Sequence, residues 1–265
     1  MKPTVILITG TNRGKYFVPT SDLLELTLTI GIGKGLATAY LAMPNTTVIA
    51  TVRDASVEST FELSSLAKGL NSHLIINQLS LDDPAGATQA VSRIQKEYSV
   101  HHIDVVIANA GICNHWGPVQ GMEDADMVAH FEVNTLGPLR LFRAAAPLLK
   151  ASGQPKFVYV STALASIAGL ENSPSLTAAY GVSKVAGNYL IKKIHGEDEA
   201  LIAFSIDPGF VQTDMGNRGA QAGGLAQAPV TIAESVEGII EQIKISTKST
   251  TSGKFIQFNG GTLPW

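Results

Sequence analysis

The sequence predicts a single-domain α/β fold of the Rossmann type, a doubly wound parallel sheet of about seven strands with helices on both faces. Short β-branched runs alternate with helix-length segments along most of the 265 residues, which implies successive βαβ units. The runs are almost continuously apolar, as expected for strands that are covered on both faces. No linker separates a second domain, so residues 1–265 are expected to form one dinucleotide-binding and catalytic unit.

The predicted elements follow one another in strict alternation until late in the chain. The strands are Thr4–Thr9, Thr47–Val52, His73–Leu79, Ile103–Ala108, Lys156–Ser161, Leu201–Asp207 and Lys254–Phe258. The helices are 33–43, 55–69, 84–98, 123–150, 177–195 and 231–246. The Gly-, Ala- and Gln-rich stretch Gly216–Pro229 interrupts this pattern and has the composition of a mobile loop, so residues 214–230 are predicted to be a substrate lid.

Composition excludes several classes of function. Hydrophobic residues make up 45% and charged residues 15% of the chain, which is too apolar for an intrinsically disordered protein. The formal net charge is −3 and no basic run occurs, so neither a nucleic acid nor an anionic membrane is an expected partner. No apolar stretch reaches the length of a membrane span, and a cytoplasmic protein is expected. The single cysteine, Cys113, excludes a disulfide within the chain, and no metal site is predicted.

Two glycine clusters follow the first strand. Thr9-Gly10-Thr11-Asn12-Arg13-Gly14 comes directly after it, and Gly31-Ile32-Gly33-Lys34-Gly35 opens the first helix seventeen residues later. Glycines at a strand-to-helix turn allow the backbone to approach a pyrophosphate, whose charge is stabilised by the helix N-terminus. Either cluster alone is also compatible with an ordinary turn.

Further motifs occur at the ends of later strands. Asn109-Ala110-Gly111 ends the fourth strand, and Asn134 lies in the helix after it. Tyr180 and Lys184 open a later helix, and Asp207–Thr213, which reads DPGFVQT, ends the sixth strand. In this order and spacing the motifs resemble those of the short-chain dehydrogenase/reductase family over residues 3–260. Residues 44–54 and 260–265 resemble the fungal norsolorinic-acid-ketoreductase-like branch, near the sniffer-type carbonyl reductases.

The resemblance implies a nicotinamide cofactor. Its expected contacts are Gly10, Asn12, Arg13, Gly14, Ile32, Gly33, Arg53, Ser80, Asn109, Ala110, Gly111, Tyr180, Lys184, Pro208, Gly209, Val211 and Thr213. Val52 stands where an NAD enzyme usually carries an acidic residue, and Arg13 and Arg53 offer guanidinium groups to a 2′-phosphate, so NADP(H) is predicted. Alternatively, the two arginines are solvated surface residues. Ser80 replaces an aspartate that often contacts adenine in this family.

Tyr180 and Lys184 are four residues apart, so they share one face of their helix. An ammonium group beside a phenol favours the phenolate, and together with the oxidised cofactor's charge it is expected to lower the pKa of Tyr180 from about 10 toward about 7. A second pair with the same spacing, Tyr189 and Lys193, points to the opposite side of the helix. For Tyr189 a packing or subunit-interface role is expected.

The resemblance also implies a hydroxyl that polarises the substrate carbonyl and an asparagine that binds a relay water. Thr162 stands at the hydroxyl position, with the neighbouring Ser161 as the alternative. Asn134 is the relay asparagine by resemblance, although an asparagine within a helix is otherwise often solvated or bonded to backbone. The substrate pocket is expected from residues 113–118, 163–177 and 215–229, with Cys113 as a packed, unreactive thiol.

These observations predict an NADPH-dependent oxidoreductase that reduces a ketone or aldehyde, with Tyr180 as general acid/base. By family resemblance the assembly is expected to be a homodimer or homotetramer. The alternative is a non-catalytic or cofactor-impaired dinucleotide-binding protein on the same fold, because the glycine motif is split.

The splitting segment is residues 15–31. Its deletion would join Gly14 to Ile32 and restore an uninterrupted glycine motif. Seventeen codons are in frame, and Gly14-Lys15-Tyr16 can be encoded by a string resembling a splice donor, so we expect a retained, translated intron; a genuine surface insertion is the alternative. With the segment present, the first helix could be extended backwards from Ser21 and Asp22 or the segment could bulge over the cleft.

Overall fold

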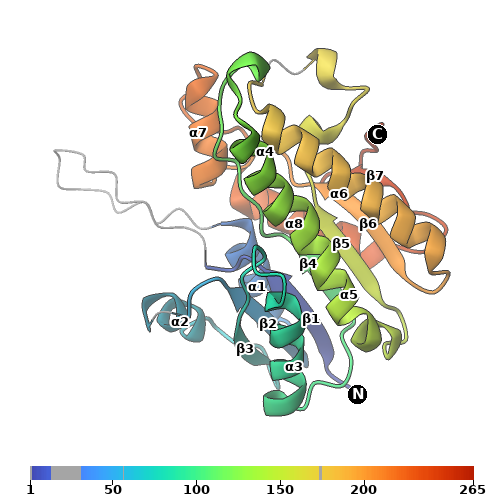
Figure 1. Ribbon diagram of the computed structural model, residues 1–265. Helices are drawn as coiled ribbons and strands as arrows, with labels where there is room; N and C mark the ends of the chain where they lie inside the picture. Colours follow the sequence, from blue (N-terminus) through green and yellow to red (C-terminus); the bar gives the residue numbers. More distant parts are fainter. Residues whose placement is uncertain (1, 13–30, 56, 173–174) are drawn as a thin grey trace.

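The computed structural model describes residues 2–12, 31–55, 57–172 and 175–265, and it confirms the predicted doubly wound α/β fold (Figure 1). Seven parallel strands form one sheet in the order β3-β2-β1-β4-β5-β6-β7. The strands are β1 (Thr4–Thr9), β2 (Thr46–Val52), β3 (His73–Gln78), β4 (Val105–Ala108), β5 (Lys156–Val160), β6 (Ile202–Asp207) and β7 (Phe255–Gln257). The α-helices of the described ranges are α1 (Ile32–Ala42), α2 (Val57–Ser64), α3 (Gly86–Tyr98), α4 (Asp124–Phe131), α5 (Gly137–Lys150), α6 (Ala178–Glu197), α7 (Asp214–Ala222) and α8 (Ile232–Ile245).

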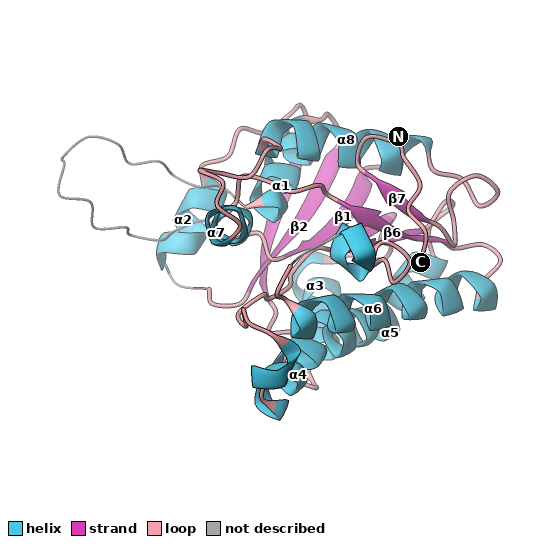
Figure 2. Cartoon of the chain, turned by 90° about the horizontal axis from the view of Figure 1, so that it is seen from above, coloured by secondary structure: helices cyan, strands magenta, loops and turns pink. Residues whose placement is uncertain are grey.

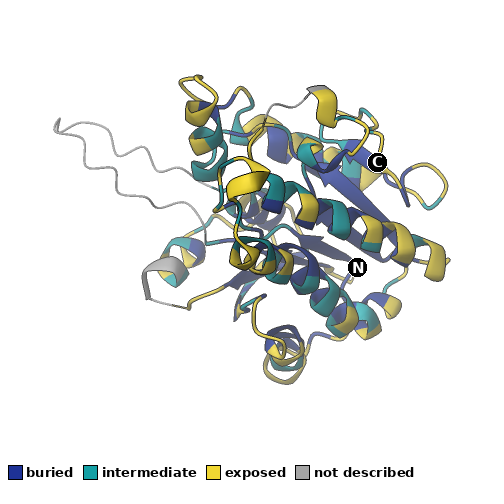
Figure 3. Cartoon of the chain, turned by 45° about the horizontal axis from the view of Figure 1, so that its top comes forward, coloured by how far each residue is buried: buried dark blue, intermediate teal, exposed yellow. Residues whose placement is uncertain are grey.

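Helices cover both faces of the sheet, with α1 and α8 on one face and α3, α5 and α6 on the other (Figure 2). Each face has its own apolar core, and successive strand residues alternate between the two: Leu7 belongs to the core beneath α3, α5 and α6, and Ile8 to the core beneath α1 and α8. In Figure 3 the strands are accordingly buried between exposed outer helix faces. This double burial explains why the strands have no polar alternation.

The strand order reverses between β1 and β4, which are neighbours in the sheet although β2 and β3 lie between them in the chain. Crossovers from these two strands leave in opposite directions and open a crevice at their carboxyl ends. The loops after β1, β4, β5 and β6 meet there. The fold therefore brings the glycine, asparagine, hydroxyl and Asp-Pro-Gly motifs to one edge of the sheet.

Two predicted elements were wrong in detail. The helix expected over 123–150 is interrupted by a π-helical turn, η2 (Glu132–Leu136), which separates α4 from α5. The stretch expected to be a loop contains α7, because Thr213 caps the helix by accepting a hydrogen bond from the backbone N–H of Gly216 at 3.1 Å, and Ala220 is completely buried. The cap and the burial outweigh the unfavourable glycine content.

Within the described ranges, no helix combines the length and apolar character needed to cross a membrane. The same ranges hold no group of three or more His, Cys, Asp or Glu side chains arranged to bind a metal ion.

Candidate active site

A cavity of about 670 Å³ occupies the crevice at the carboxyl ends of the strands. Most of the sequence-predicted cofactor residues line it. These are Gly10, Asn12, Ile32, Gly33, Arg53, Asn109, Ala110, Gly111, Tyr180, Lys184, Pro208, Gly209, Val211 and Thr213. Arg13, Gly14 and nearly all of the predicted insertion 15–31 lie outside the residues that the structure describes.

Close backbone packing shapes the glycine side of the cavity. Gly10 has a φ of +73°, and a Cβ there would lie 3.0 Å from Ala110. A Cβ at Gly33 would lie 2.5 Å from Asn109 Nδ2 and closer still to the Gly10 carbonyl oxygen. Asn109 Nδ2 donates to the Thr9 carbonyl at 2.8 Å, while the Thr9 hydroxyl accepts from the backbone N–H groups of Asn109 and Ala110. Side chains at positions 10 and 33 would therefore separate β1, β4 and α1.

The N-terminus of α1 opens directly into this cavity. Gly31 has an extended backbone, with φ −80° and ψ 158°, and precedes the first helical residue Ile32. An α1 extended backwards through this position is therefore wrong. Gly31, Ile32 and Gly33 all line the cavity, so the unpaired N–H groups of the first helical turn lie beside Gly10, as a pyrophosphate site requires.

At the end of the cavity near β2 and β3, the described residues supply one cation and one carboxylate. Arg53 is exposed and lines the cavity directly after β2. Ser80 does not line it; its hydroxyl donates to the carboxylate of Asp82, which does. The sequence-based prediction placed Ser80 at this contact and missed Asp82. The acidic side chain two positions after Ser80 was the signal that could have identified it.

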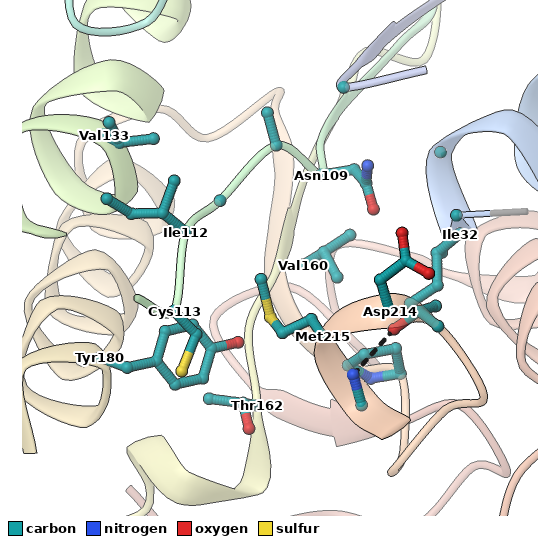
Figure 4. Close-up of a pocket in the computed structure, with 18 of the residues that line it drawn as sticks. Ile32, Asn109, Ile112, Cys113, Val133, Val160, Thr162, Tyr180, Asp214 and Met215 are labelled. Atoms are coloured by element: carbon teal, nitrogen blue, oxygen red, sulfur yellow. Dashed lines mark hydrogen bonds between the residues drawn. The ribbon is translucent and has the colours of Figure 1, made fainter. Parts of the chain in front are cut away.

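The other end of the cavity contains Tyr180, in the first turn of α6, and Cys113 from the loop after β4 (Figure 4). Tyr180 follows Thr177, the N-cap residue of α6, so its side chain lies at the carboxyl edge of the sheet. The Thr162 side chain, which follows β5, lies near the Tyr180 phenol (Figure 4). The structure therefore brings the predicted hydroxyl group and the predicted acid/base together.

The electrostatics of Tyr180 differ from the sequence-based expectation. Burial raises the pKa of Tyr180 above its ordinary value of about 10, and the Cys113 thiol and the Asp207 carboxyl raise it further, whereas the hydrogen bond with Thr162 lowers it. The Lys184 ammonium lies 5.9 Å from the ring centroid and does not offset burial. The expected lowering of the Tyr180 pKa toward about 7 includes the charge of the oxidised cofactor, and it stays a prediction.

Lys184 is almost fully buried and held from two sides. Its Nζ donates to the Val160 carbonyl at 2.7 Å and lies 4.6 Å from the centroid of the Tyr159 ring. Gly111 packs against it, since a Cβ at that position would lie 3.3 Å from Nζ. The ammonium therefore lies on the cavity wall between β4, β5 and α6.

Thr162 and Ser161 both line the cavity, but their hydroxyls have different surroundings. The Thr162 hydroxyl contacts Tyr180 and also accepts from the backbone N–H of Leu164 at 3.3 Å. The Ser161 hydroxyl is buried and has no hydrogen-bond partner among the described residues. The Thr162–Tyr180 contact favours Thr162, and Ser161 stays the alternative.

Asn134 does not line the cavity; it supports the wall behind it. Its side chain exchanges hydrogen bonds with the backbone of Ile112, accepting from N–H at 2.8 Å and donating to the carbonyl at 2.9 Å. It also donates to the Ser183 hydroxyl at 3.0 Å. Its own carbonyl, in the π-helical turn, accepts from the Tyr159 hydroxyl at 2.8 Å. Asn134 thus links the loop after β4 to α6. This agrees with the alternative stated above, that an asparagine within a helix is often bonded to backbone.

Apolar side chains form much of the cavity wall on the side of Tyr180, namely Trp116, Phe210, Met215 and Leu164. A Cβ at Gly219 of α7 would lie 2.9 Å from the Trp116 indole and 3.5 Å from the Phe210 ring, so α7 packs directly against both aromatic side chains. The predicted ranges 163–177 and 215–229 contribute in part, through Leu164 of η3 (Ala163–Ala165), Thr177, Met215, Gly216, Arg218 and Gly219. Phe210 and Asp214 were missed as lining residues, although both adjoin the Asp-Pro-Gly motif.

The second Tyr-Lys pair lies outside the site. Tyr189 is 68% exposed, and Lys193 forms an ion pair with Glu197 at 3.2 Å on the outer face of α6. Tyr189 therefore does not pack within the chain, and only its expected role at a subunit interface stays a prediction.

Comparison with known proteins gives consistent matches. Residues 27–222 match the family model for short chain dehydrogenases. The chain is 41% identical over 265 residues to norsolorinic acid ketoreductase of Aspergillus parasiticus, covering 99% of this chain and 91% of that protein. It is 37% identical to norsolorinic acid ketoreductase stcE of Emericella nidulans, covering 100% and 94%.

Solved structures agree with the sequence matches. An NADPH-bound carbonyl reductase from chicken fatty liver superposes with a TM-score of 0.81 at 25% identity, and the match covers 100% of both chains. The carbonyl reductase Sniffer of D. melanogaster gives 0.78 at 26% identity, also over 100% of both chains.

Together, the doubly wound sheet and the Tyr180–Lys184 cavity define a nicotinamide-dependent oxidoreductase. The chain belongs to the short-chain dehydrogenase/reductase family.

Proposed function

We propose that this enzyme is an NADPH-dependent carbonyl reductase that converts a ketone or aldehyde to an alcohol, with Tyr180 as proton donor. One observation carries the proposal: the Tyr180 phenol, with the Thr162 side chain near it, shares one cavity with the glycine turn. Reduction needs a proton for the carbonyl oxygen, and a tyrosine phenol carries one near neutrality. The names of the fungal ketoreductases and of the two carbonyl reductases support the same reaction.

The cavity fits a nicotinamide dinucleotide. The close approach at Gly10 and Gly33 places backbone groups beside the N-terminus of α1. Gly10, Asn12, Ile32 and Gly33 would hold the pyrophosphate, while Asn109, Ala110, Gly111, Lys184, Pro208, Gly209, Val211 and Thr213 would line the remainder. When bound there, the cofactor supplies the hydride.

The chain's own residues would do the rest of the chemistry. The Thr162 hydroxyl orients the substrate carbonyl oxygen beside Tyr180, and the Tyr180 hydroxyl passes its proton to that oxygen. Lys184, held at the Val160 carbonyl, places a positive charge behind the tyrosine that stabilises the phenolate left after transfer. Asn134 keeps the loop after β4 in place and thereby fixes the cavity wall.

A Tyr180→Phe variant tests the proposal and separates it from a non-catalytic dinucleotide-binding protein. With NADPH and a panel of activated aryl ketones, kcat/KM should fall by at least about 100-fold, while NADPH binding measured by fluorescence should be unchanged. Tyr189→Phe is the matched control, because this tyrosine has the same spacing to a lysine but lies outside the cavity. Equal inertness of wild type and Tyr180→Phe, with NADPH still bound, would support the non-catalytic alternative.

Single Ala substitutions assign the hydroxyl. Thr162→Ala should lower kcat more than Ser161→Ala, because the Thr162 side chain contacts Tyr180. A larger loss at Ser161 would move the assignment to that residue.

The preference for NADP(H) rests on Arg53, the described cation at the end of β2, and on Arg13 by sequence. Arg53→Ala should raise the KM for NADPH about tenfold and leave the KM for NADH nearly unchanged. Equal turnover of the wild type with NADH and NADPH at the same concentration would contradict this preference.

We also infer a homodimer or homotetramer. Large apolar side chains lie exposed on α4 and α6, namely Val128 (65%), Phe131 (38%), Val182 (47%) and Tyr189 (68%). These two helices pack side by side, so a second copy could cover both. Light scattering should give at least a dimer at micromolar concentration; a strict monomer would contradict the inference. A cytoplasmic location is expected as well, and imaging of a fluorescent fusion tests it.

A further inference from the structure

The substrate end of the cavity carries a positive charge that the proposed reaction does not use. Arg218 lies on α7 and lines the cavity together with Trp116, Met215 and Gly219. It reaches this position because Gly219 packs α7 directly against the Trp116 and Phe210 rings. A guanidinium group is thus placed at the rim of a mainly apolar wall.

Hydrogen bonding leaves most of this guanidinium available. Arg218 Nε donates to the Asp214 carbonyl at 3.3 Å, one helical turn earlier (dashed line in Figure 4). Across the described ranges, no carboxylate lies within 4.0 Å of its nitrogens, and neither Nη atom has a hydrogen-bond partner. The Nε edge of the guanidinium is therefore held by the helix, and its two Nη atoms can donate to two acceptor oxygens.

The charge of Arg218 acts on Cys113, on the same side of the cavity as Tyr180. It lowers the pKa of the Cys113 thiol against the larger effect of burial, and Cys113 lies beside Tyr180 (Figure 4). The opposing carboxylate of Asp214 also lines the cavity, but in Figure 4 it points toward Ile32 and away from Tyr180. Arg218 thus places a positive charge on the Cys113 side of the substrate end.

A substrate that fills this end would take water from Arg218. A neutral aromatic ring would replace none of the lost hydrogen bonds, whereas a carboxylate or ionised phenol would accept two of them. The aromatic and thioether side chains of Trp116, Phe210 and Met215 suit the remaining flat, apolar part of such a molecule.

We propose that Arg218 is a specificity residue that binds an anionic substituent of the substrate, so that the preferred substrates are aryl ketones bearing a carboxylate or an acidic phenol. This inference rests on the proposed carbonyl reduction and adds the substrate class to it. The role of Arg218 is distinct from catalysis, since the proton comes from Tyr180.

The test compares acids with neutral analogues of the same shape. The probes are 3- and 4-acetylbenzoate and the corresponding acetylbenzamides, assayed with NADPH at low ionic strength. Arg218→Gln should lower kcat/KM for the acids about tenfold, mainly through KM, and leave the amides within about twofold. Arg218→Lys should keep part of the preference, and added salt should reduce it in the wild type.

Arg143→Gln is the matched control, because Arg143 is an exposed arginine of α5 outside the cavity. It should change neither substrate class. An equal loss for acids and amides in Arg218→Gln would overturn the proposal, since stacking on the ring or a structural role would affect both. No change for the acids would overturn it as well.

Direct binding keeps the two proposals distinguishable. Calorimetric titration of 4-acetylbenzoate into the NADP⁺-loaded protein should give about tenfold weaker binding to Arg218→Gln than to wild type. If no ketone is turned over but this difference is found, the reductase proposal fails and the anion subsite stands. Equal binding to both proteins refutes the subsite whatever the turnover.

Discussion

Gly187 offers a sharp test of how the catalytic helix is packed. It lies in the middle of α6, against the ring of Tyr159. A Cβ at this position would lie 2.6 Å from Tyr159 Cε1 and closer still to Cζ and the hydroxyl. Carbon atoms normally meet at about 3.5–4.0 Å, so Gly187→Ala must displace either the ring or the helix by about 1 Å.

The expected cost follows from what the ring does. Tyr159 is fully buried, and its hydroxyl donates to the Asn134 carbonyl. Overpacking of a buried site costs about 1–3 kcal/mol, and an impaired buried hydrogen bond adds about 1–2 kcal/mol. Higher helix propensity of alanine returns about 0.5–1 kcal/mol, so the free energy of unfolding should fall by about 1–4.5 kcal/mol.

The same helix supplies the matched control. A Cβ at Gly196 would meet no atom within 4 Å, so Gly196→Ala should raise the free energy of unfolding by about 0.5–1 kcal/mol. Urea denaturation followed by circular dichroism measures both variants on one scale. If Gly187→Ala is as stable as Gly196→Ala, the packing of α6 on Tyr159 is not as tight as described and the reasoning is refuted.

Three further predictions concern a thiol, a buried ammonium and the insertion. Burial raises the pKa of Cys113 to about 11, so alkylation by iodoacetamide, followed by mass spectrometry, should be slow at pH 8 and increase up to about pH 11; a midpoint near 8.5 would contradict the burial. Lys156 Nζ donates to the Ile243 and Ser246 carbonyls at the end of α8, so Lys156→Met should lose about 1–3 kcal/mol of stability at pH 7. Burial lowers the Lys156 pKa in the folded state, so the unfolded chain binds more protons between that pKa and about 10.5. Over this pH window, the free energy of unfolding of the wild type should rise with pH relative to that of Lys156→Met. Urea-denaturation profiles that change with pH in parallel for the two proteins would refute this prediction. Deletion of residues 15–31 places Gly14 at the N-cap of α1, where Gly31 now lies, and should tighten NADPH binding about tenfold by fluorescence titration; equal or tighter binding by the full-length chain would argue against a disruptive insertion.

The sheet could be predicted because its signal is local and repeated. Each strand is buried on both faces, so a continuous apolar run marks it, and the predicted β1 agrees with the observed Thr4–Thr9 at both ends. α7 could not be predicted from composition, because its stability comes from the Thr213 cap and from packing across the cavity. The cap is a local contact, but the packing of Gly219 on Trp116 joins residues far apart in the sequence.

The sequence predicted which residues line the cavity better than it predicted what each of them does there. Spacing placed Tyr180 and Lys184 on one helix face, and both line the cavity. Spacing could not show that burial outweighs the lysine in setting the tyrosine pKa, because desolvation depends on every element packed around the ring. Asn134 likewise shows its part only through its bonds to Ile112 and Ser183, which the linear sequence does not contain.

The contact of Gly219 with Trp116 allows the size of the accepted substrate to change independently of the proton-transfer chemistry. Position 219 sets the distance between α7 and the opposite wall, yet it touches none of the residues proposed for proton transfer. A methyl or larger group there would act as a spacer that widens the entrance in small steps. Substrate size can thus diverge by changes in one codon while the reaction itself is preserved, which makes this residue a natural starting point for directed evolution of new substrate ranges.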